Sequence, residues 1–345
     1  MNLSYRARQN LRLVLIGALI LVLIAIVLWM VWIIWLDRYV VYTRDGAQLD
    51  FDRPLGQFSG ATAEPPQLSE TVSIYYNEGE NEINLTNELT TIHGYYADTA
   101  TLRNSVDEVR QQIEQLPRGT PILLDMKNTA GQFHYSTTVG SQTSGRVDIA
   151  AMDSLLEYLR TSRHYTIARI PAFRDYDFGL HNVPYGLSLP SGIGLWMDET
   201  GCYWLDPTSD GTLNYLIQIV NELKGLGFDE VVFTDFCFPD TDKILFDGDR
   251  TKAINEAAEN LAIICSSGSF CVSFVSNDPQ FKLPDRRCRL YRTDVAAADV
   301  RYAAEASGVT DTSINLVFLT ETNDTRYDDY CVLRPLDSAY FVDGT

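Results

Sequence analysis

The chain has 345 residues, of which 46% are hydrophobic and 21% are charged, and its formal net charge is −19. This length supports one large α/β domain or two ordinary domains, and the composition excludes a disordered or collagen-like chain. The excess of acidic side chains argues against a nucleic-acid-binding protein, because binding to phosphates requires clustered Lys and Arg. We therefore expect no nucleic acid among the partners.

A long uncharged segment lies near the N-terminus. Leu13–Leu36 is dominated by Leu, Ile, Val and Trp, and it is long enough for a helix that crosses about 30 Å of hydrocarbon. It exceeds the apolar part of a signal peptide, and Arg6, Arg8 and Arg12 precede it. The positive-inside rule then places residues 1–12 in the cytoplasm. The sequence predicts a single-pass transmembrane helix at residues 13–36 in the plasma membrane, with the C-terminal domain outside the cell.

The segment after this helix has a different composition. Residues 37–90 contain Pro54, Pro65 and Pro66 among Gly, Ser, Thr and Glu, which predicts an extracellular stalk or linker. The acidic excess lies beyond this anchor, and an acidic surface admits neutral or cationic ligands.

Strand-like and helix-like segments alternate from residue 91 onward. Short apolar runs predict eight strands, at residues 91–97, 121–126, 165–173, 230–236, 270–275, 288–291, 314–319 and 330–333. Helical spacing predicts helices at residues 104–116, 152–159, 213–226, 253–265 and 295–306.

This alternation is typical of parallel βα repetition and predicts an α/β fold, a (β/α)8 TIM-type barrel over residues 91–345. The connections after the fifth and seventh strands leave little room for helices, so the C-terminal half is expected to be reduced. A doubly wound open sheet is the alternative, although no Gly-rich nucleotide motif follows a strand.

Polar residues follow several of the predicted strands, where catalytic groups of a barrel lie. Asp125 and Asp235 are the candidate catalytic pair, because glycoside hydrolysis uses two carboxyl groups. Lys127 and Arg169 would hold a neighbouring carboxylate ionised. The alternative is an ion-pair network of Asp125, Lys127 and Arg169 that only closes the top of the barrel.

Further candidates for substrate binding lie in the long connection after the third strand. Aromatic rings beside carboxylates suit the apolar faces and hydroxyl groups of sugars. With Lys127 and Arg169, the candidate substrate-binding residues are Asp175, Trp196, Trp204 and Asp206. Asp206 precedes Pro207 and a predicted helix, so helix capping is its alternative role.

Several motifs in a fixed order resemble one known family. They include residues 123–127 (LLDMK), 194–196 (GLW), 204–207 (WLDP) and 227–233 (GFDEVVF), followed by Phe238 and Pro239. Between about Gly94 and Pro239 the chain is similar to the glycoside-hydrolase-like family labelled DUF4015, and the resemblance is to a divergent, membrane-anchored member. It implies a TIM barrel that acts on carbohydrate. Where the family has F-D-Y-x-R-F-P, this chain has Thr234 and Cys237 at the Asp and Arg positions, and the acid moves to Asp235.

Two functions follow from these observations. The first is a membrane-anchored extracellular glycoside hydrolase that cleaves an envelope or environmental polysaccharide by acid/base chemistry with two carboxylates. The second is a catalytically inactive barrel that binds glycan or an envelope partner, which the residues at 234 and 237 favour. The expected partners are a neutral or cationic carbohydrate and the membrane.

Cysteine and histidine residues add little to these hypotheses. The six cysteines lie in the part predicted to be exported, and the sequence does not decide between disulfides and buried free thiols. The four histidines show no metal-ligand spacing, so no metal and no cofactor are expected.

Overall fold

The computed structural model describes residue 29 and residues 40–43, 46–49, 89–140 and 142–340. The predicted membrane helix and most of the predicted stalk lie outside these residues. Among the helices of the described part of the chain, none is both long enough and apolar enough to cross a bilayer. The chain divides into two compact units, Met1–Glu82 and Ile83–Thr345.

The described residues of the first unit form one antiparallel strand pair. Strand β1 (Val40–Thr43) pairs with β2 (Gly46–Leu49), and the register aligns Val40 with Leu49. This pair adds regular structure to a region for which the sequence predicts a linker.

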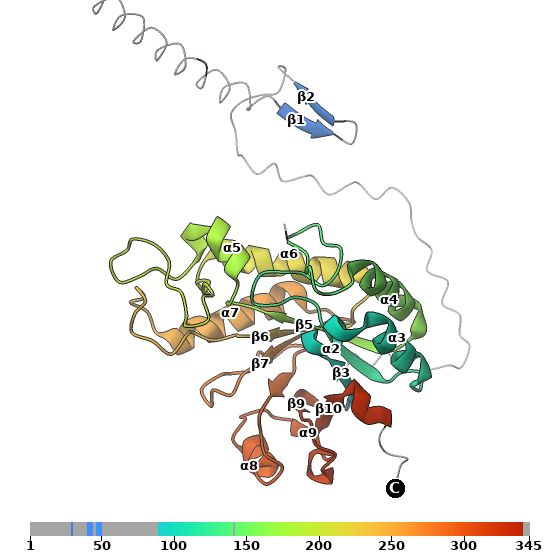
Figure 1. Ribbon diagram of the computed structural model, residues 1–345. Helices are drawn as coiled ribbons and strands as arrows, with labels where there is room; N and C mark the ends of the chain where they lie inside the picture. Colours follow the sequence, from blue (N-terminus) through green and yellow to red (C-terminus); the bar gives the residue numbers. More distant parts are fainter. Residues whose placement is uncertain (1–28, 30–39, 44–45, 50–88, 141, 341–345) are drawn as a thin grey trace, which may run out of the picture. The chain divides into compact units, whose positions relative to one another are not determined.

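The second unit is built on a closed barrel of eight parallel strands in the order β10-β3-β4-β5-β6-β7-β8-β9 (Figure 1). The strands are β3 (His93–Ala97), β4 (Pro121–Asp125), β5 (Tyr165–Pro171), β6 (Glu230–Thr234), β7 (Cys271–Val275), β8 (Leu290–Arg292), β9 (Leu316–Leu319) and β10 (Cys331–Pro335). Each overlaps one of the eight predicted strands, so the predicted barrel is confirmed and the open sheet is excluded.

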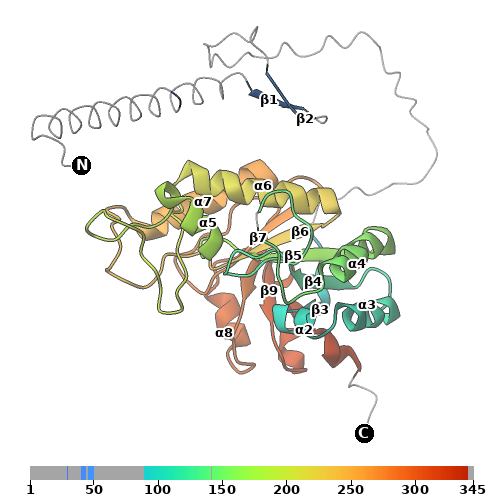
Figure 2. The same cartoon turned by 45° about the horizontal axis from the view of Figure 1, so that its top comes forward.

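Long helices lie outside the ring of strands in its first half (Figure 2). They are α3 (Val106–Gln115), α4 (Ile149–Ser162), α6 (Asp210–Leu226) and α7 (Arg250–Cys265), and α2 (Thr99–Asn104) and α5 (Tyr176–His181) are shorter. Helix α6 ends at Gly227, whose φ of 99° is accessible to glycine at little cost. The apolar faces of these helices cover strands that are themselves apolar on both sides, as expected of a parallel sheet.

The second half of the barrel carries much less helix. Residues 276–289 connect β7 to β8 without a helix, α8 (Val300–Glu305) has six residues and α9 (Thr312–Asn315) has four. The helix predicted at residues 295–306 is therefore shorter than expected. The sheet is nevertheless closed, so the reduction concerns the helices and not the strands.

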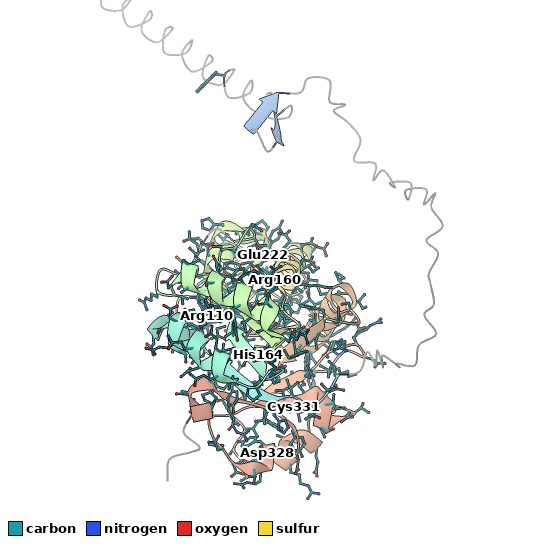
Figure 3. All side chains as sticks on the ribbon, turned by 90° about the vertical axis from the view of Figure 1, so that its right-hand side faces the viewer. Arg110, Arg160, His164, Glu222, Asp328 and Cys331 are labelled. Atoms are coloured by element: carbon teal, nitrogen blue, oxygen red, sulfur yellow. The ribbon has the colours of Figure 1, made fainter. Side chains whose placement is uncertain are left out.

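Polar contacts fasten the outer layers together. On the face shown in Figure 3, Arg110 of α3 donates to Ser154 of α4 at 2.8 Å. Glu222 of α6 accepts hydrogen bonds from Tyr135 and Thr137 of the connection between β4 and α4. This connection is thereby held against α6.

The interior of the barrel has its own apolar core, separate from the core beneath the helices. It consists of Ile92, Leu123, Ile167, Val232, Tyr291, Val317, Cys331 and Leu333. Because side chains alternate along a strand, residues two positions further along these strands also face inward.

All six cysteines are free thiols, so the structure contains no disulfide. Cys237 is exposed and the other five are buried: Cys202, Cys265, Cys271, Cys288 and Cys331.

Candidate active site at the carboxyl ends of the strands

The inward-facing rows of three neighbouring strands end in polar residues. Asp125, Arg169 and Thr234 each lie two positions beyond an interior core residue of β4, β5 or β6. The register aligns Asp125 with Arg169 directly. The mouth of the barrel therefore carries a carboxylate, a guanidinium group and a hydroxyl group side by side.

Asp125 is held by three donors. Its Oδ1 accepts from Arg169 Nε at 2.5 Å, and its Oδ2 accepts from the backbone N–H and the hydroxyl of Thr99 at 2.7 and 2.9 Å. The side chains of Asp125 and Arg169 keep 13% and 18% of their surface exposed. This carboxylate is fixed in position and still accessible from the mouth of the barrel.

These two residues line a cavity of about 500 Å³, which we call the Asp125 cavity. Its walls include Asp98, Thr99, Asp125, Asn128, Arg169 and Thr234. The volume lies within the range of small-molecule sites, so one or two sugar rings fit.

Lys127 and Asp175, both predicted to bind substrate, pair with each other in the interior of the protein. Lys127 Nζ donates to Asp175 Oδ2, and neither side chain has any exposed surface. Asp175 also accepts from the hydroxyl of Tyr215 and from the backbone N–H of Phe178. The second of these hydrogen bonds caps the N-terminus of α5. The charged ends of Lys127 and Asp175 thus stabilise the connections above the barrel, and Lys127 also lines the Asp125 cavity.

Asp235 follows the last residue of β6 and has a φ of 48°, in the left-handed region. In a regular strand, the side chain that follows the inward-facing Thr234 would point outward. The left-handed backbone of Asp235 therefore determines the direction of its side chain. Its Oδ2 accepts from Thr234 at 3.0 Å, and its Oδ1 lies 3.9 Å from Arg174 Nη1. Burial raises the pKa of Asp235, against the effects of Thr234 and Arg174. Among the described residues, Asp235 does not line the Asp125 cavity, whereas Thr234 does.

Trp204 belongs to a network that fixes the long connection between β5 and α6. Asp198 accepts from Arg174, from the indole of Trp204 and from Thr200. Burial alone would raise the pKa of Asp198, but these hydrogen bonds outweigh it and hold the pKa well below its usual range. Trp204 is only 8% exposed, so its ring is used for packing.

The other candidates of this connection also lie apart from the cavity. Trp196 is half-buried against the outer core, and neither tryptophan lines the Asp125 cavity. Asp206 accepts from the N–H and hydroxyl of Thr208, which orders the turn before α6, although the residue at the N-cap position of that helix is Ser209. Tyr176 reaches the cavity wall only through its backbone, whose N–H donates to the carbonyl of the lining residue Thr129, while its ring stacks on Tyr203.

His134 supports the backbone of Asp125 from behind. Its Nδ1 lies 2.8 Å from the carbonyl oxygen of Asp125, the ring is fully buried, and Nε2 has no hydrogen-bond partner among the described residues. Burial lowers the pKa of His134. The sequence gives only a histidine without metal spacing, so this contact was not predicted.

A second carboxylate–guanidinium ion pair lies at the opposite end of the barrel. Glu230 accepts from Arg289, Tyr165, Tyr291 and Ser273, at distances between 2.5 and 2.9 Å. The side chains of Glu230 and Arg289 are 0% and 1% exposed. A charged residue at the start of the apolar segment 230–233 is the only signal of this network in the sequence.

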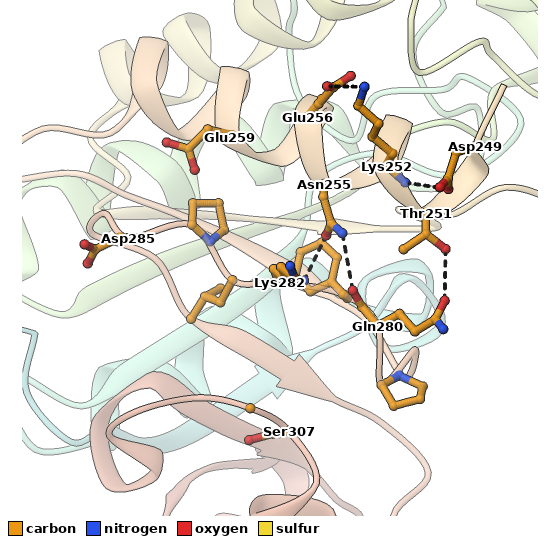
Figure 4. Close-up of a pocket in the computed structure, with 15 residues that line it drawn as sticks. Asp249, Thr251, Lys252, Asn255, Glu256, Glu259, Gln280, Lys282, Asp285 and Ser307 are labelled. Carbon is orange, nitrogen blue, oxygen red and sulfur yellow. Dashed lines mark hydrogen bonds and ion pairs between the residues drawn. The ribbon is translucent and has the colours of Figure 1, made fainter.

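A larger cavity, of about 960 Å³, lies elsewhere, between α7 and the connection from β7 to β8 (Figure 4). Its polar walls bind one another: Asn255 contacts the backbone of Gln280 and Lys282, and Lys252 pairs with Glu256. It contains no strand end, so we place the candidate site at the mouth of the barrel.

Comparison with known proteins bears on the family and the fold. Residues 96–265 match the family model described as "Putative glycosyl hydrolase domain" (DUF4015). The resemblance to this glycoside-hydrolase-like family that the motifs predict is therefore confirmed over these residues. A search of curated proteins gives no match.

Several solved structures are similar to this chain at low sequence identity. An α-galactosidase from Lactobacillus brevis is 8% identical with a TM-score of 0.50, over 74% of this chain and 39% of that chain. A hypothetical protein from Ruminiclostridium thermocellum is 21% identical with a TM-score of 0.44, over 52% and 96%. The glycoside hydrolase domain of PelA from Pseudomonas aeruginosa is 11% identical with a TM-score of 0.44, over 72% and 97%.

Proposed function

We propose that this protein is a membrane-anchored, extracellular glycoside hydrolase that cleaves a neutral or cationic polysaccharide at the mouth of its barrel. The observation that carries the proposal is Asp125, a carboxylate fixed by Arg169 and Thr99 and exposed in a cavity at the carboxyl ends of the strands. This is where enzymes with this fold hold their catalytic groups. The anchor is the apolar segment at residues 13–36.

Hydrolysis by this route needs a second carboxyl group. Asp235 is the candidate from the sequence, and a raised pKa suits a general acid, which must be protonated to donate. Its position supports this role less well, since Thr234 and not Asp235 lines the cavity beside Asp125.

The second candidate function is glycan binding without turnover. It is favoured by Thr234, which occupies the family's Asp position on the inward row of β6 and cannot serve as an acid there. In this case Asp125, Arg169 and Asn128 would bind sugar hydroxyls as a lectin does.

The test is a panel of neutral and cationic polysaccharides, assayed for new reducing ends and for binding with the full-length protein in detergent. Asp125→Asn keeps the shape of the side chain, and we expect it to lower turnover about 100-fold or more. Glu256→Gln, an exposed change on α7, is the matched control and should leave turnover unaltered.

The outcome separates the two functions. Turnover that is lost in Asp125→Asn but kept in Glu256→Gln supports the hydrolase. Binding without turnover by the unmodified protein, weakened by Asp125→Asn, supports the binding function. A protein that neither binds nor cleaves any member of the panel contradicts both.

A further inference from the structure

A further carboxylate at the barrel mouth lies just beyond the end of a strand, as Asp125 lies at the end of β4. Val317 belongs to the interior core, and Leu319 packs against it. The N–H of Thr320 donates to the carbonyl of Leu333 on β10, so the ladder extends beyond the end of β9. Glu321 follows Thr320 in a bend just beyond the end of β9, and it lines a cavity together with residues of the mouth.

Glu321 lines a second cavity, of about 690 Å³, together with Tyr96, Asp98 and Arg169. Asp98 and Arg169 also line the Asp125 cavity. The two cavities are thus adjacent: Arg169 lines both, with Asp125 in the first and Glu321 in the second.

The carboxyl groups of this cleft differ in their hydrogen bonds. Asp98 accepts from the N–H and hydroxyl of Thr101 and caps the N-terminus of α2. Asp125 is held by Arg169 and Thr99. Glu321 is exposed and makes no hydrogen bond or ion pair with any described residue. Its charge is nevertheless felt by Tyr96, whose pKa is raised to about 12 by burial first and by Glu321 second.

We propose that Glu321 is the second catalytic carboxyl group, opposite Asp125, and that Asp235 is not; this inference rests on the proposed hydrolase function. Strands β4 and β9 are three places apart in the ring, with β3 and β10 between them. Strands β4 and β6, by contrast, have only β5 between them. For Asp125 and Glu321 we therefore expect the wider carboxyl spacing of an inverting enzyme, which leaves room for a water molecule.

The roles follow from the contacts of each group. Protonated Glu321 donates its proton to the glycosidic oxygen while the bond from that oxygen to the anomeric carbon breaks and its electron pair moves to the oxygen. Water adds to the anomeric carbon, and the carboxylate of Asp125 accepts the proton that the water loses. Asp125 is the base because Arg169 binds it as a carboxylate, and Glu321 is the acid because no cation binds it.

The experiment compares two substrates: the panel polysaccharide that the full-length protein cleaves, and the dinitrophenyl glycoside of its terminal sugar. The dinitrophenolate group leaves without a proton, so loss of a general acid affects it little. For Glu321→Gln we expect turnover to fall about 100-fold or more on the polysaccharide and less than about 10-fold on the dinitrophenyl glycoside. Asp235→Asn should change both rates less than about threefold, and the surface control Glu305→Gln should change neither.

Folding does not confuse this result, because Glu321 is exposed and its amide variant should melt at the same temperature as the unmodified protein. Polysaccharide turnover that persists in Glu321→Gln, or that disappears in Asp235→Asn instead, overturns the assignment while leaving the hydrolase function intact. An unmodified protein that cleaves no polysaccharide overturns the proposed function itself, and the catalytic role of Glu321 with it.

Discussion

Two carboxylate–guanidinium pairs occupy the interior of the same barrel and have opposite characters. Glu230 and Arg289, at the amino ends of the strands, are fully buried and every carboxylate oxygen has two partners. Asp125 and Arg169, at the carboxyl ends, are partly exposed and line a cavity. A buried pair must be completely hydrogen-bonded to be tolerated. The difference teaches that the first pair maintains the barrel and the second is available to a ligand.

Breaking the Glu230 pair should have the largest effect. Glu230→Ala leaves the charge of Arg289 buried and uncompensated, and we expect the free energy of unfolding to fall by roughly 3–5 kcal/mol. Urea unfolding measures this loss. Asp125→Ala is the matched variant at the mouth, and its loss should be less than half as large because water can reach Arg169. Equal losses would show that the two pairs do not differ in the way their burial indicates.

His134, which contacts the backbone carbonyl of Asp125, should affect how the free energy of unfolding depends on pH. Burial lowers the pKa of His134 in the folded protein below its usual 6.5. The unfolded chain therefore binds the proton more readily, and stability should fall as the pH drops below about 6.5, by at most about 1.4 kcal/mol per pH unit.

The comparison uses urea unfolding between about pH 7 and pH 5. His134→Asn retains a donor for the Asp125 carbonyl and should remove this contribution to the slope. His181→Asn, at an exposed histidine, should leave the slope as it is. An unchanged slope in His134→Asn would contradict the assignment.

The smallest effect is expected at Asp235, beside the mouth pair. Burial raises its pKa in the folded protein, so its ionised form costs stability at neutral pH and this cost is absent at acid pH. Asp235→Asn removes the charge, and asparagine tolerates the left-handed backbone. We expect the variant to be slightly more stable than the parent at neutral pH and equal to it below about pH 3.8. A variant that is less stable at neutral pH would show that the Arg174 contact dominates.

Local patterns were sufficient for the architecture and for the central pair. Apolar runs predicted all eight strands, and the adjacency of Asp125 and Arg169 follows because both lie near the carboxyl ends of neighbouring parallel strands. Glu321 had a usable signal as well, since it lies two positions beyond the apolar run 314–319. Attention to the residues just past the end of each run would have found it.

Contacts between distant segments could not be predicted in the same way. Lys127 and Asp175 are separated by 48 positions, and Glu230 and Arg289 by 59. Each pair forms only because the closed barrel and its long connections bring the segments together. The hydrogen bond between Trp204 and Asp198 could not be predicted for the same reason, since Asp198 lies on a connection whose path no local pattern indicates.

The six free thiols have a consequence for how the barrel is made. Burial raises the pKa of every one of them: Cys202, Cys237, Cys265, Cys271, Cys288 and Cys331. A protonated thiol is a poor nucleophile, so these cysteines react slowly with oxidants and with disulfides. The barrel needs no cross-link to close, and its maturation should require neither an oxidant nor a disulfide isomerase on whichever side of a membrane it folds.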